Sequence, residues 1–288
     1  MSRPKVLFLL VLTALMWSSS GVLVKSVSWN PMAVASLRGL IATVTLLVMN
    51  GGLRRSEFLP IHWLSGLFLA LTEFFYVCSL GRTTAANSMV LMYTAPLWVG
   101  LFAHLFVGER TAGSDFAYMG AIFLGMLLFF WEGLGAGGLG GDFLAVVSGI
   151  FFAAQVLCLR KIHGRFPVSA VIAGNFLTFL GGCWAIGAPF PDAGGFSRLA
   201  LLGVFQVGVA YYIYAKVSAH ATSLELVMIT MLDPILGPVW VLLALGERPG
   251  AVAALGGVIV VGAVVLWGIR KSGRKPEKTA EAGEVRVP

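Results

Sequence analysis

Two stretches of this chain share one pattern: Tyr93-Thr-Ala-Pro-Leu-Trp-Val-Gly-Leu-Phe-Ala-His-Leu-Phe-Val-Gly-Glu-Arg110 and Met231-Leu-Asp-Pro-Ile-Leu-Gly-Pro-Val-Trp-Val-Leu-Leu-Ala-Leu-Gly-Glu-Arg248. In each, a proline stands thirteen residues before a glutamate, the spacer is apolar apart from His104, and the closing tripeptide is Gly-Glu-Arg. Thirteen helical residues span about 20 Å, which is most of the hydrocarbon core of a bilayer. Each copy therefore predicts a membrane helix with an internal proline and a charged end at the water interface.

The rest of the chain has the composition of a membrane protein. Of its 288 residues, 58% are hydrophobic and only 11% are charged, whereas roughly a quarter of a soluble domain is charged. The charged residues gather in short clusters between apolar runs of roughly 20 residues, the length that a spanning helix needs. The sequence predicts an all-α polytopic membrane protein with ten transmembrane helices. The expected segments are 6–25, 31–50, 62–81, 83–106, 112–131, 141–160, 168–188, 197–217, 219–245 and 250–269.

The distribution of basic residues predicts the orientation. If the N-terminus is inside, fifteen of the twenty lysines and arginines fall on the inner side and four on the outer side. This positive-inside bias predicts that both termini are cytoplasmic. The net charge of +7 does not indicate nucleic acid, because six of the basic residues lie in a polar tail, residues 270–288. We expect this tail to be disordered and to lie against anionic lipid or in water.

The two halves of the chain are related as a repeat. A shift of 138 residues places Tyr76 on Tyr214 and Pro96 on Pro234. We therefore expect two five-helix repeats, residues 1–134 and 135–269, followed by the tail. Because five is an odd number, the two repeats insert with opposite topology. Inverted repeats recur in secondary transporters, whose binding sites lie where the halves meet.

Several motifs of the chain resemble those of a known family. Trp17 followed by small residues, Arg38 in the second helix, and the two proline-to-Gly-Glu-Arg stretches resemble the drug/metabolite transporter superfamily, in its ten-helix EamA-type branch. The resemblance covers residues 6 to 269 and is greatest to the bacterial aromatic amino acid exporters. It implies export of amino acids across the cell inner membrane. The family motif is often Trp-Gly, whereas Trp17 here is followed by three serines.

Polar and aromatic side chains at membrane depth give the candidate substrate site. A charge there costs at least about 2.5 kcal/mol, so each needs a partner or a function. Tyrosines occur at matching positions of the two halves, where their rings can contact an apolar group while their hydroxyls bind a polar one. The expected substrate-binding residues are Trp17, Ser18, Ser20, Glu73, Tyr76, Tyr93, Phe152, Gln155, Tyr211, Tyr214 and Glu225.

Helix-breaking residues give the candidate hinges. A proline removes one helical hydrogen bond and leaves a carbonyl free, which favours a kink beside the transport path. The expected hinge residues are Gly21, Pro96, Pro234 and Gly237. A static kink that neighbouring helices tolerate is the alternative.

Several alternatives stay open. Glu73 and Glu225 are either proton carriers, partners of a substrate ammonium, or structural residues that pair with Arg38 or form hydrogen bonds to a broken helix. Arg38 and Asp233 are expected to be structural. Transport is either facilitated diffusion or proton exchange, the cargo is either amino acids or drugs and other small metabolites, and the state is either monomer or homodimer.

Other function classes find no support in the sequence. An intramembrane enzyme would need a nucleophile with a base, or metal-ligand spacing, and neither is present. We expect no cofactor and no metal. Polar residues are also too few to line a continuous aqueous channel.

Overall fold

The computed structural model describes residues 1–19, 27–52, 58–135, 138–162, 165–236, 240 and 250–272. Every regular element in these ranges is helical. The first half holds α1 (Arg3–Ser18), α3 (Pro31–Asn50), α4 (Pro60–Leu80), α5 (Ala85–Met92), α6 (Ala95–Val107), α7 (Gly113–Phe129) and the short η2 (Trp131–Gly133). The second half holds α8 (Leu139–Lys161), α9 (Pro167–Gly182), η3 (Cys183–Ala185), α10 (Ala193–Leu201), η4 (Leu202–Val209), α11 (Ala210–Ser218), α12 (Ser223–Thr230) and α14 (Ala251–Ser272).

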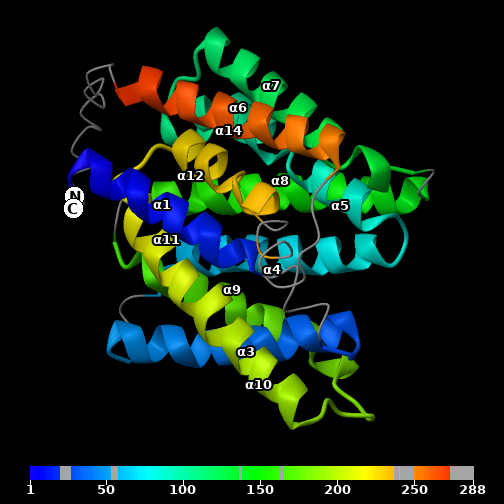
Figure 1. The fold of residues 1–288 in the computed structure, drawn as a ribbon. Helices are drawn as coiled ribbons and strands as arrows, with labels where there is room; N and C mark the ends of the chain where they lie inside the picture. Colours follow the sequence, from blue (N-terminus) through cyan, green and yellow to red (C-terminus); the bar gives the residue numbers. More distant parts are fainter. Residues whose placement is uncertain are drawn as a thin grey trace, which may run out of the picture.

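The helices form one bundle (Figure 1). At its centre α4 packs against α8 and α9, and α1 packs against α11 and α12. On one side α14 lies along α7, and on the opposite side α3 lies along α9 and η4. Helices from the two halves therefore alternate through the bundle, so the interface between the halves runs through its centre.

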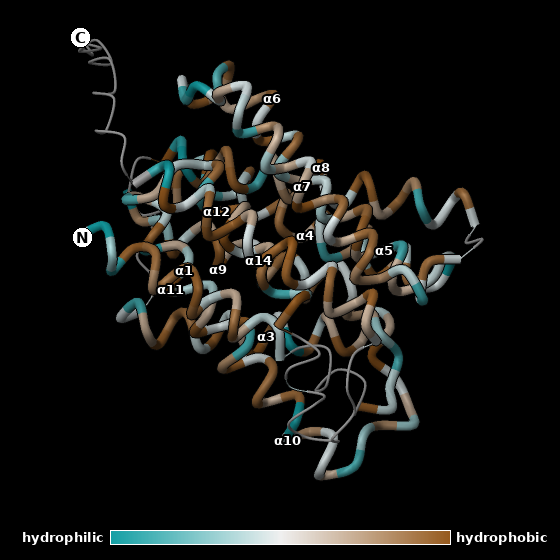
Figure 2. Tube along the Cα trace, turned by 45° about the horizontal axis from the view of Figure 1, so that its top comes forward, coloured by the Kyte–Doolittle hydropathy of each residue, from teal (hydrophilic) through white to brown (hydrophobic). Residues whose placement is uncertain are grey.

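The outer surface is apolar. Leu105 in the last turn of α6 is 74% exposed, and Val258 within the long apolar α14 is 70% exposed. Figure 2 shows hydrophobic residues along the helices and hydrophilic residues mainly at their ends. Seven helical spans in the described residues are long and apolar enough to cross a membrane, and α7 is a shorter apolar helix. The prediction of an all-α polytopic membrane protein is confirmed, and each of the ten expected segments contains helix.

Close packing at glycine holds several of these helices together. A Cβ atom added at Gly256 of α14 would lie 2.4 Å from the backbone nitrogen of Phe129, and one at Gly125 of α7 would lie 2.9 Å from the carbonyl oxygen of Gly256. The two backbones are thus in direct contact. Small residues provide such contacts in membranes, where lipid tails supply no hydrophobic drive between helices.

Two expected helices differ from continuous spans. The segment 83–106 is divided into α5 and α6 by a turn at Tyr93 and Thr94. The break follows from Pro96, which has no N–H to donate to the carbonyl of Met92. Gly149 of α8 packs onto this carbonyl, since a Cβ there would lie 2.6 Å from it. The segment 219–245 has its own turn, at Met231 and Leu232, before Pro234.

The segment 197–217 also departs from a plain helix. It begins as α10, passes through eight π-helical residues in η4, and ends as α11. The α14 helix ends at Ser272, so it extends three residues into the expected tail of residues 270–288. The remainder of the tail lies outside the described residues.

Candidate functional site

A polar cluster lies where α3, α4 and η4 meet. Arg38 Nη2 donates to Glu73 Oε2 at 2.7 Å, and Arg38 Nη1 donates to Gln206 Oε1 at 3.4 Å. Gln206 Nε2 in turn donates to the carbonyl oxygen of Trp17 at 3.5 Å. The guanidinium thus joins one helix of the first half to one of the second.

The π-helix positions Gln206. Its wider turn lies against α3 through two glycines, because Gly203 packs on Ile41 and Gly208 packs on Thr45. A Cβ at Gly203 would lie 2.5 Å from Ile41. Single π-turns are frequent at functional sites, and here the element brings the amide of Gln206 to Arg38.

The two helix breaks are joined by a hydrogen bond. The hydroxyl of Tyr93 donates to Asp233 Oδ2 at 2.8 Å. Tyr93 lies in the turn before Pro96, and Asp233 directly precedes Pro234, so each partner sits beside the proline of its own half. The bond therefore links the breaks of the two repeats across the centre of the bundle.

Aromatic rings surround these groups. Trp17 of α1 packs on Tyr211 and on Tyr214 of α11, with ring centroids 5.1 Å apart in both pairs. Tyr76 lies one turn after Glu73 on α4 and within electrostatic range of Arg38, Glu73 and Asp233. Tyr211 is also within range of these three charged residues. We call Arg38, Glu73, Gln206, Tyr93 and Asp233, with this wall of Trp17, Tyr76, Tyr211 and Tyr214, the central cluster.

The charged members of the central cluster are not sealed in protein. The side chains of Arg38 and Glu73 keep 14% and 25% of their surface accessible. A charge at this depth is costly in lipid, so we expect the accessible surface of these two side chains to face a polar space.

The structure brings together six of the residues predicted from the sequence: Trp17, Glu73, Tyr76, Tyr93, Tyr211 and Tyr214. Of the other predicted residues, Ser18 is the last residue of α1, and Phe152 and Gln155 are in α8. Ser18 accepts a hydrogen bond from Trp240 Nε1 at 2.8 Å. Phe152 is in the apolar core, and the side-chain amide of Gln155 is fully buried without a hydrogen-bond partner among the described residues. Ser20, Gly21 and Gly237 lie outside the described residues.

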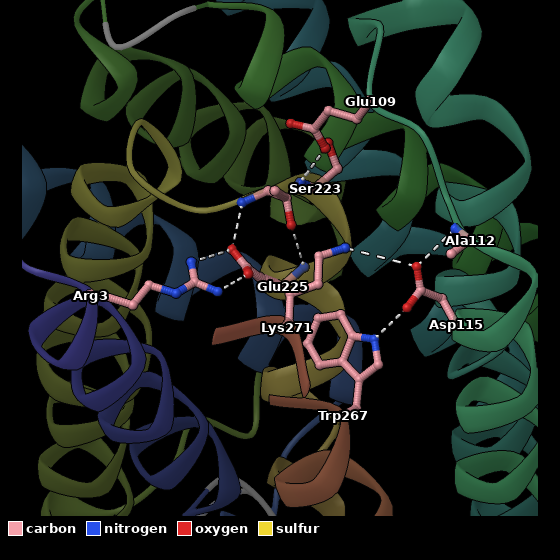
Figure 3. A network of polar contacts seen from close by, with 9 residues as sticks. Arg3, Glu109, Ala112, Asp115, Ser223, Glu225, Trp267 and Lys271 are labelled. Atoms are coloured by element: carbon pink, nitrogen blue, oxygen red, sulfur yellow. Dashed lines mark hydrogen bonds and ion pairs between the residues drawn. The ribbon is translucent and has the colours of Figure 1, made fainter. Parts of the chain in front are cut away.

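The structure places Glu225 elsewhere. It is the third residue of α12, where Thr222 and Glu225 form a capping box: the backbone N–H of Thr222 donates to Glu225 Oε2 at 2.8 Å. Its carboxylate also forms an ion pair with Arg3, in the first turn of α1 (Figure 3). Because N-terminal α1 is cytoplasmic by the positive-inside rule, this carboxylate lies at the inner end of the bundle.

Further polar contacts lie beside Glu225 at the inner end of the bundle (Figure 3). Glu109 accepts from Arg160 Nε at 2.9 Å. It also accepts from the backbone N–H of Ser223 at 2.7 Å, so the end of the first repeated stretch is bound to α8 and α12. Beside it, Asp115 of α7 accepts from Trp267 Nε1 of α14 at 2.9 Å. We call these contacts, with Arg3–Glu225, the inner network.

Three residues of the central cluster were not predicted as binding residues. Arg38 and Asp233 were expected to be structural, and Gln206 was not singled out. Arg38 and Asp233 could have been recognised as site residues from the sequence, because each is a charged residue in an apolar segment. Gln206 had a weaker signal, since one amide in an apolar run is compatible with many positions, and only the π-helix decides where it points.

Two further features bear on what the chain can bind. A surface groove of about 410 Å³ between α4 and α8 is lined by Phe74, Phe75, Cys78, Arg82, Gly140 and Leu144. It is nearly all apolar and lies apart from the central cluster. Within the described ranges, no three His, Cys, Asp or Glu side chains are grouped to hold a metal ion.

Ten helical segments in two halves, with a polar cluster at their interface, define the class of multi-pass secondary transporters. The particular family follows from comparison. The model of the EamA-like transporter family matches residues 4–131 and again residues 139–269. The chain belongs to the EamA-like transporter family, in the drug/metabolite transporter superfamily. It is a multi-pass plasma-membrane transporter and not an enzyme.

Individual relatives agree with this assignment. The chain is 26% identical to a protein of Archaeoglobus fulgidus described as an uncharacterized transporter, over 92% of this chain and 97% of the other. It is also 26% identical to a protein of Streptantibioticus cattleyicolor described as a probable terminal-alkyne amino-acid exporter, over 96% of this chain and 98% of the other. One solved crystal structure, 19% identical, superposes with a TM-score of 0.81 over 95% of this chain and 100% of that chain.

Proposed function

We propose that this transporter exports amino acids, including aromatic and other neutral ones, across the inner membrane by alternating access. The observation that carries the proposal is the central cluster, in which one guanidinium and two carboxylates lie beside a wall of one tryptophan and three tyrosines. A zwitterion with an apolar side chain matches both parts of this arrangement.

The guanidinium of Arg38 has donors to spare for a substrate carboxylate. An arginine has five N–H donors, and the described contacts of Arg38 are one bond to Glu73 and one to Gln206. Trp17 and Tyr211 keep 8% and 7% of their surface accessible for the substrate side chain, and the fully buried Tyr214 supports the ring of Trp17. Hydroxyls on the tyrosine rings can orient the polar end.

One relative supports the same substrate class. The Streptantibioticus cattleyicolor relative is described as a probable amino-acid exporter, and it aligns over almost its whole length. The resemblance of the sequence motifs to the aromatic amino acid exporters points in the same direction, and the export direction rests on this resemblance.

A second candidate function is export of cationic drugs or other small metabolites by the same fold. The observation that favours it is the charge balance of the central cluster, where two carboxylates face one guanidinium. A phosphorylated cargo fits less well, because it would require more basic residues at this depth than Arg38 supplies.

Counterflow in proteoliposomes tests the proposal. Purified protein is reconstituted with a high internal concentration of one neutral amino acid, and uptake of the same labelled amino acid is followed. Unlabelled competitors span aromatic, aliphatic, polar and charged amino acids, a quaternary ammonium drug and a nucleotide-sugar. We expect protein-dependent uptake that several amino acids inhibit. Folded protein that exchanges the drug or the nucleotide-sugar, and no amino acid, contradicts the proposal.

A further inference from the structure

The two carboxylates of the central cluster have different partners. Glu73 is already neutralised by Arg38 at 2.7 Å. Asp233 accepts a hydrogen bond from the neutral hydroxyl of Tyr93, and the described residues give it no ion pair. Among the described residues, Glu73 and Arg38 are charged groups on α4 and α3, and the hydroxyls of Tyr76, Tyr93 and Tyr211 also interact with Asp233.

An unpaired carboxylate at membrane depth is unfavourable, and a cation placed beside it is correspondingly favoured. Tyrosine rings favour the same partner, because their faces attract cations. From the geometry we infer that Asp233, held by Tyr93, is the residue that binds the ammonium group of the substrate, while Arg38 and Glu73 stay paired. This inference rests on the proposed amino-acid transport.

The assignment has a consequence for specificity. The substrate ammonium would bind the carboxylate of Asp233, which has no ion pair among the described residues. The substrate carboxylate would bind the guanidinium of Arg38, whose charge Glu73 already neutralises. Loss of the ammonium therefore costs more affinity than loss of the carboxylate. Amino-acid amides and esters, which keep only the cation, are then bound, and N-acetyl amino acids are excluded.

The test is counterflow of labelled phenylalanine with three unlabelled competitors: phenylalanine, phenylalaninamide and N-acetylphenylalanine. We expect the amide to compete within a few-fold of phenylalanine and the N-acetyl derivative not to compete. In Asp233→Asn, which keeps an acceptor for Tyr93, the apparent affinity for both ammonium compounds falls about tenfold or more, as for loss of one charge-assisted hydrogen bond. The matched control is Asp192→Asn, at the N-cap of α10, with wild-type affinities.

Each failure has its own signature. If no amino acid moves through folded protein, the proposed function is wrong. If phenylalanine is transported but Asp233→Asn keeps the wild-type affinity for both ammonium compounds, only the role of Asp233 is wrong. The same holds if N-acetylphenylalanine competes as well as phenylalaninamide. Elution of both variants as monodisperse peaks on gel filtration, like the wild type, shows that they are folded.

A second inference rests on a separate observation, the equivalence of α5 and α12. The shift of 138 residues superposes α5 (Ala85–Met92) on α12 (Ser223–Thr230) residue for residue. It also places the N-cap Thr84 on the N-cap Thr222. Each threonine side chain accepts from the backbone N–H three residues later, at Asn87 or at Glu225.

Asn87 and Glu225 make equivalent contacts at opposite ends of the bundle. Glu225 binds Arg3 in the first turn of α1, the first helix of the first half. Asn87 Nδ2 donates to Asp142 Oδ1 at 3.1 Å, in the first turn of α8, the first long helix of the second half. The inner contact is an ion pair, and the outer one is a set of hydrogen bonds that Thr83 completes by donating to the same oxygen at 2.6 Å.

We propose that these two contacts are the inner and outer latches of the transporter, related by the inverted repeat. Each joins the fourth helical unit of one half to the first helix of the other half. Alternating access requires such cross-repeat contacts to open one at a time. Both latches are closed in this structure.

Cysteine accessibility tests the latches. In a background with Cys78, Cys158 and Cys183 replaced by alanine, Tyr76→Cys reports access to the centre for a membrane-impermeant maleimide. We expect Glu225→Gln to raise labelling several-fold from the cytoplasmic face, in inverted vesicles, and Asn87→Ala to raise it from the outer face. The matched control is Glu132→Gln, an exposed residue of the short η2 after α7, with labelling unchanged.

Removing the ion pair from its other side separates a latch from a folding defect. Arg3→Gln leaves the capping box of Thr222 and Glu225 intact and is expected to raise cytoplasmic labelling as much as Glu225→Gln does, with no further rise in the double variant. Labelling that is unchanged in Glu225→Gln, that rises from the opposite face, or that stays at the background level in Arg3→Gln contradicts the latch.

Discussion

At the scale of single residues, the chain uses its few polar side chains as buried partners between helices. Asp115 is 5% exposed, yet its carboxylate accepts from the backbone N–H of Ala112 at 2.9 Å and from Trp267 Nε1 at 2.9 Å. Lys271 lies 3.8 Å from the same carboxylate. A buried carboxylate is tolerated only when such donors replace water, so the indole nitrogen is part of the packing of α7 against α14.

Trp267→Phe tests this contact. The substitution keeps most of the ring but leaves Asp115 Oδ1 without its donor, which costs about 1–3 kcal/mol. We expect a melting temperature several degrees lower in detergent, measured by loss of the monodisperse gel-filtration peak after heating. Trp184→Phe is the matched control, because Trp184 is 73% exposed. Equal melting temperatures for Trp267→Phe and the wild type would contradict the role of the indole nitrogen.

Glycine positions give a second residue-scale prediction. Gly256 contacts the backbone of α7, whereas a Cβ at Gly262 of the same helix would meet nothing within 4 Å. Overpacking a close contact typically costs about 1–3 kcal/mol. We expect Gly256→Val to lower the melting temperature and Gly262→Val to leave it near the wild-type value. The reverse order would show that α7 and α14 do not pack as described.

At the scale of elements, the sequence predicts helices better than it predicts their interruptions. The segment 31–50 coincides with α3, since Pro31 and the N-cap Asn30 mark its start and Gly51, with φ of 77°, marks its end. The break at Tyr93 and Thr94 was expected only as a kink, because the sequence does not reveal that Gly149 of α8 packs onto the freed carbonyl. The π-helix of η4 has no local signal either.

The same reasoning explains which site residues were predicted. Tyrosines at repeated positions, such as Tyr76 and Tyr214, are visible in the sequence because the repeat aligns them. The partner of a charge is not visible: Glu225 was placed with the substrate, but its capping box and Arg3 hold it at the inner end. Arg38 and Glu73 meet only through the packing of their helices.

Pro96→Ala tests whether the break between α5 and α6 serves transport. Alanine supplies the missing N–H, so the helix can continue through Tyr93 and move its hydroxyl away from Asp233. We expect a folded protein of equal or higher melting temperature whose counterflow rate falls at least several-fold. Pro60→Ala, at the first position of α4, is the control with normal transport. Full activity in Pro96→Ala would mean that the break has no role in transport.

At the scale of the whole molecule, the two halves meet along the centre of the bundle, and the polar groups lie on that interface. The central cluster contains Arg38 and Glu73 from one half and Gln206 and Asp233 from the other. The inner network joins both halves again at Arg3 and Glu225. A movement of one half against the other would therefore act on the proposed substrate site and on the proposed latches together.

The distribution of basic residues predicts the orientation of the whole molecule in the membrane. Both termini are expected to be cytoplasmic, because fifteen of twenty basic residues lie on that side. A fluorescent protein fused after residue 288 is expected to be bright, and alkaline phosphatase at the same place is expected to be inactive. Active phosphatase at the C-terminus would contradict an even number of spans with an inner N-terminus.

The most direct test of the account is a structure of the protein determined with a bound neutral aromatic amino acid. We predict that the ligand occupies the central cluster, with its ammonium beside Asp233, its carboxylate facing Arg38, and its ring against Trp17 or Tyr211. A ligand bound at the inner network near Glu225, or in the apolar groove between α4 and α8, would contradict the account.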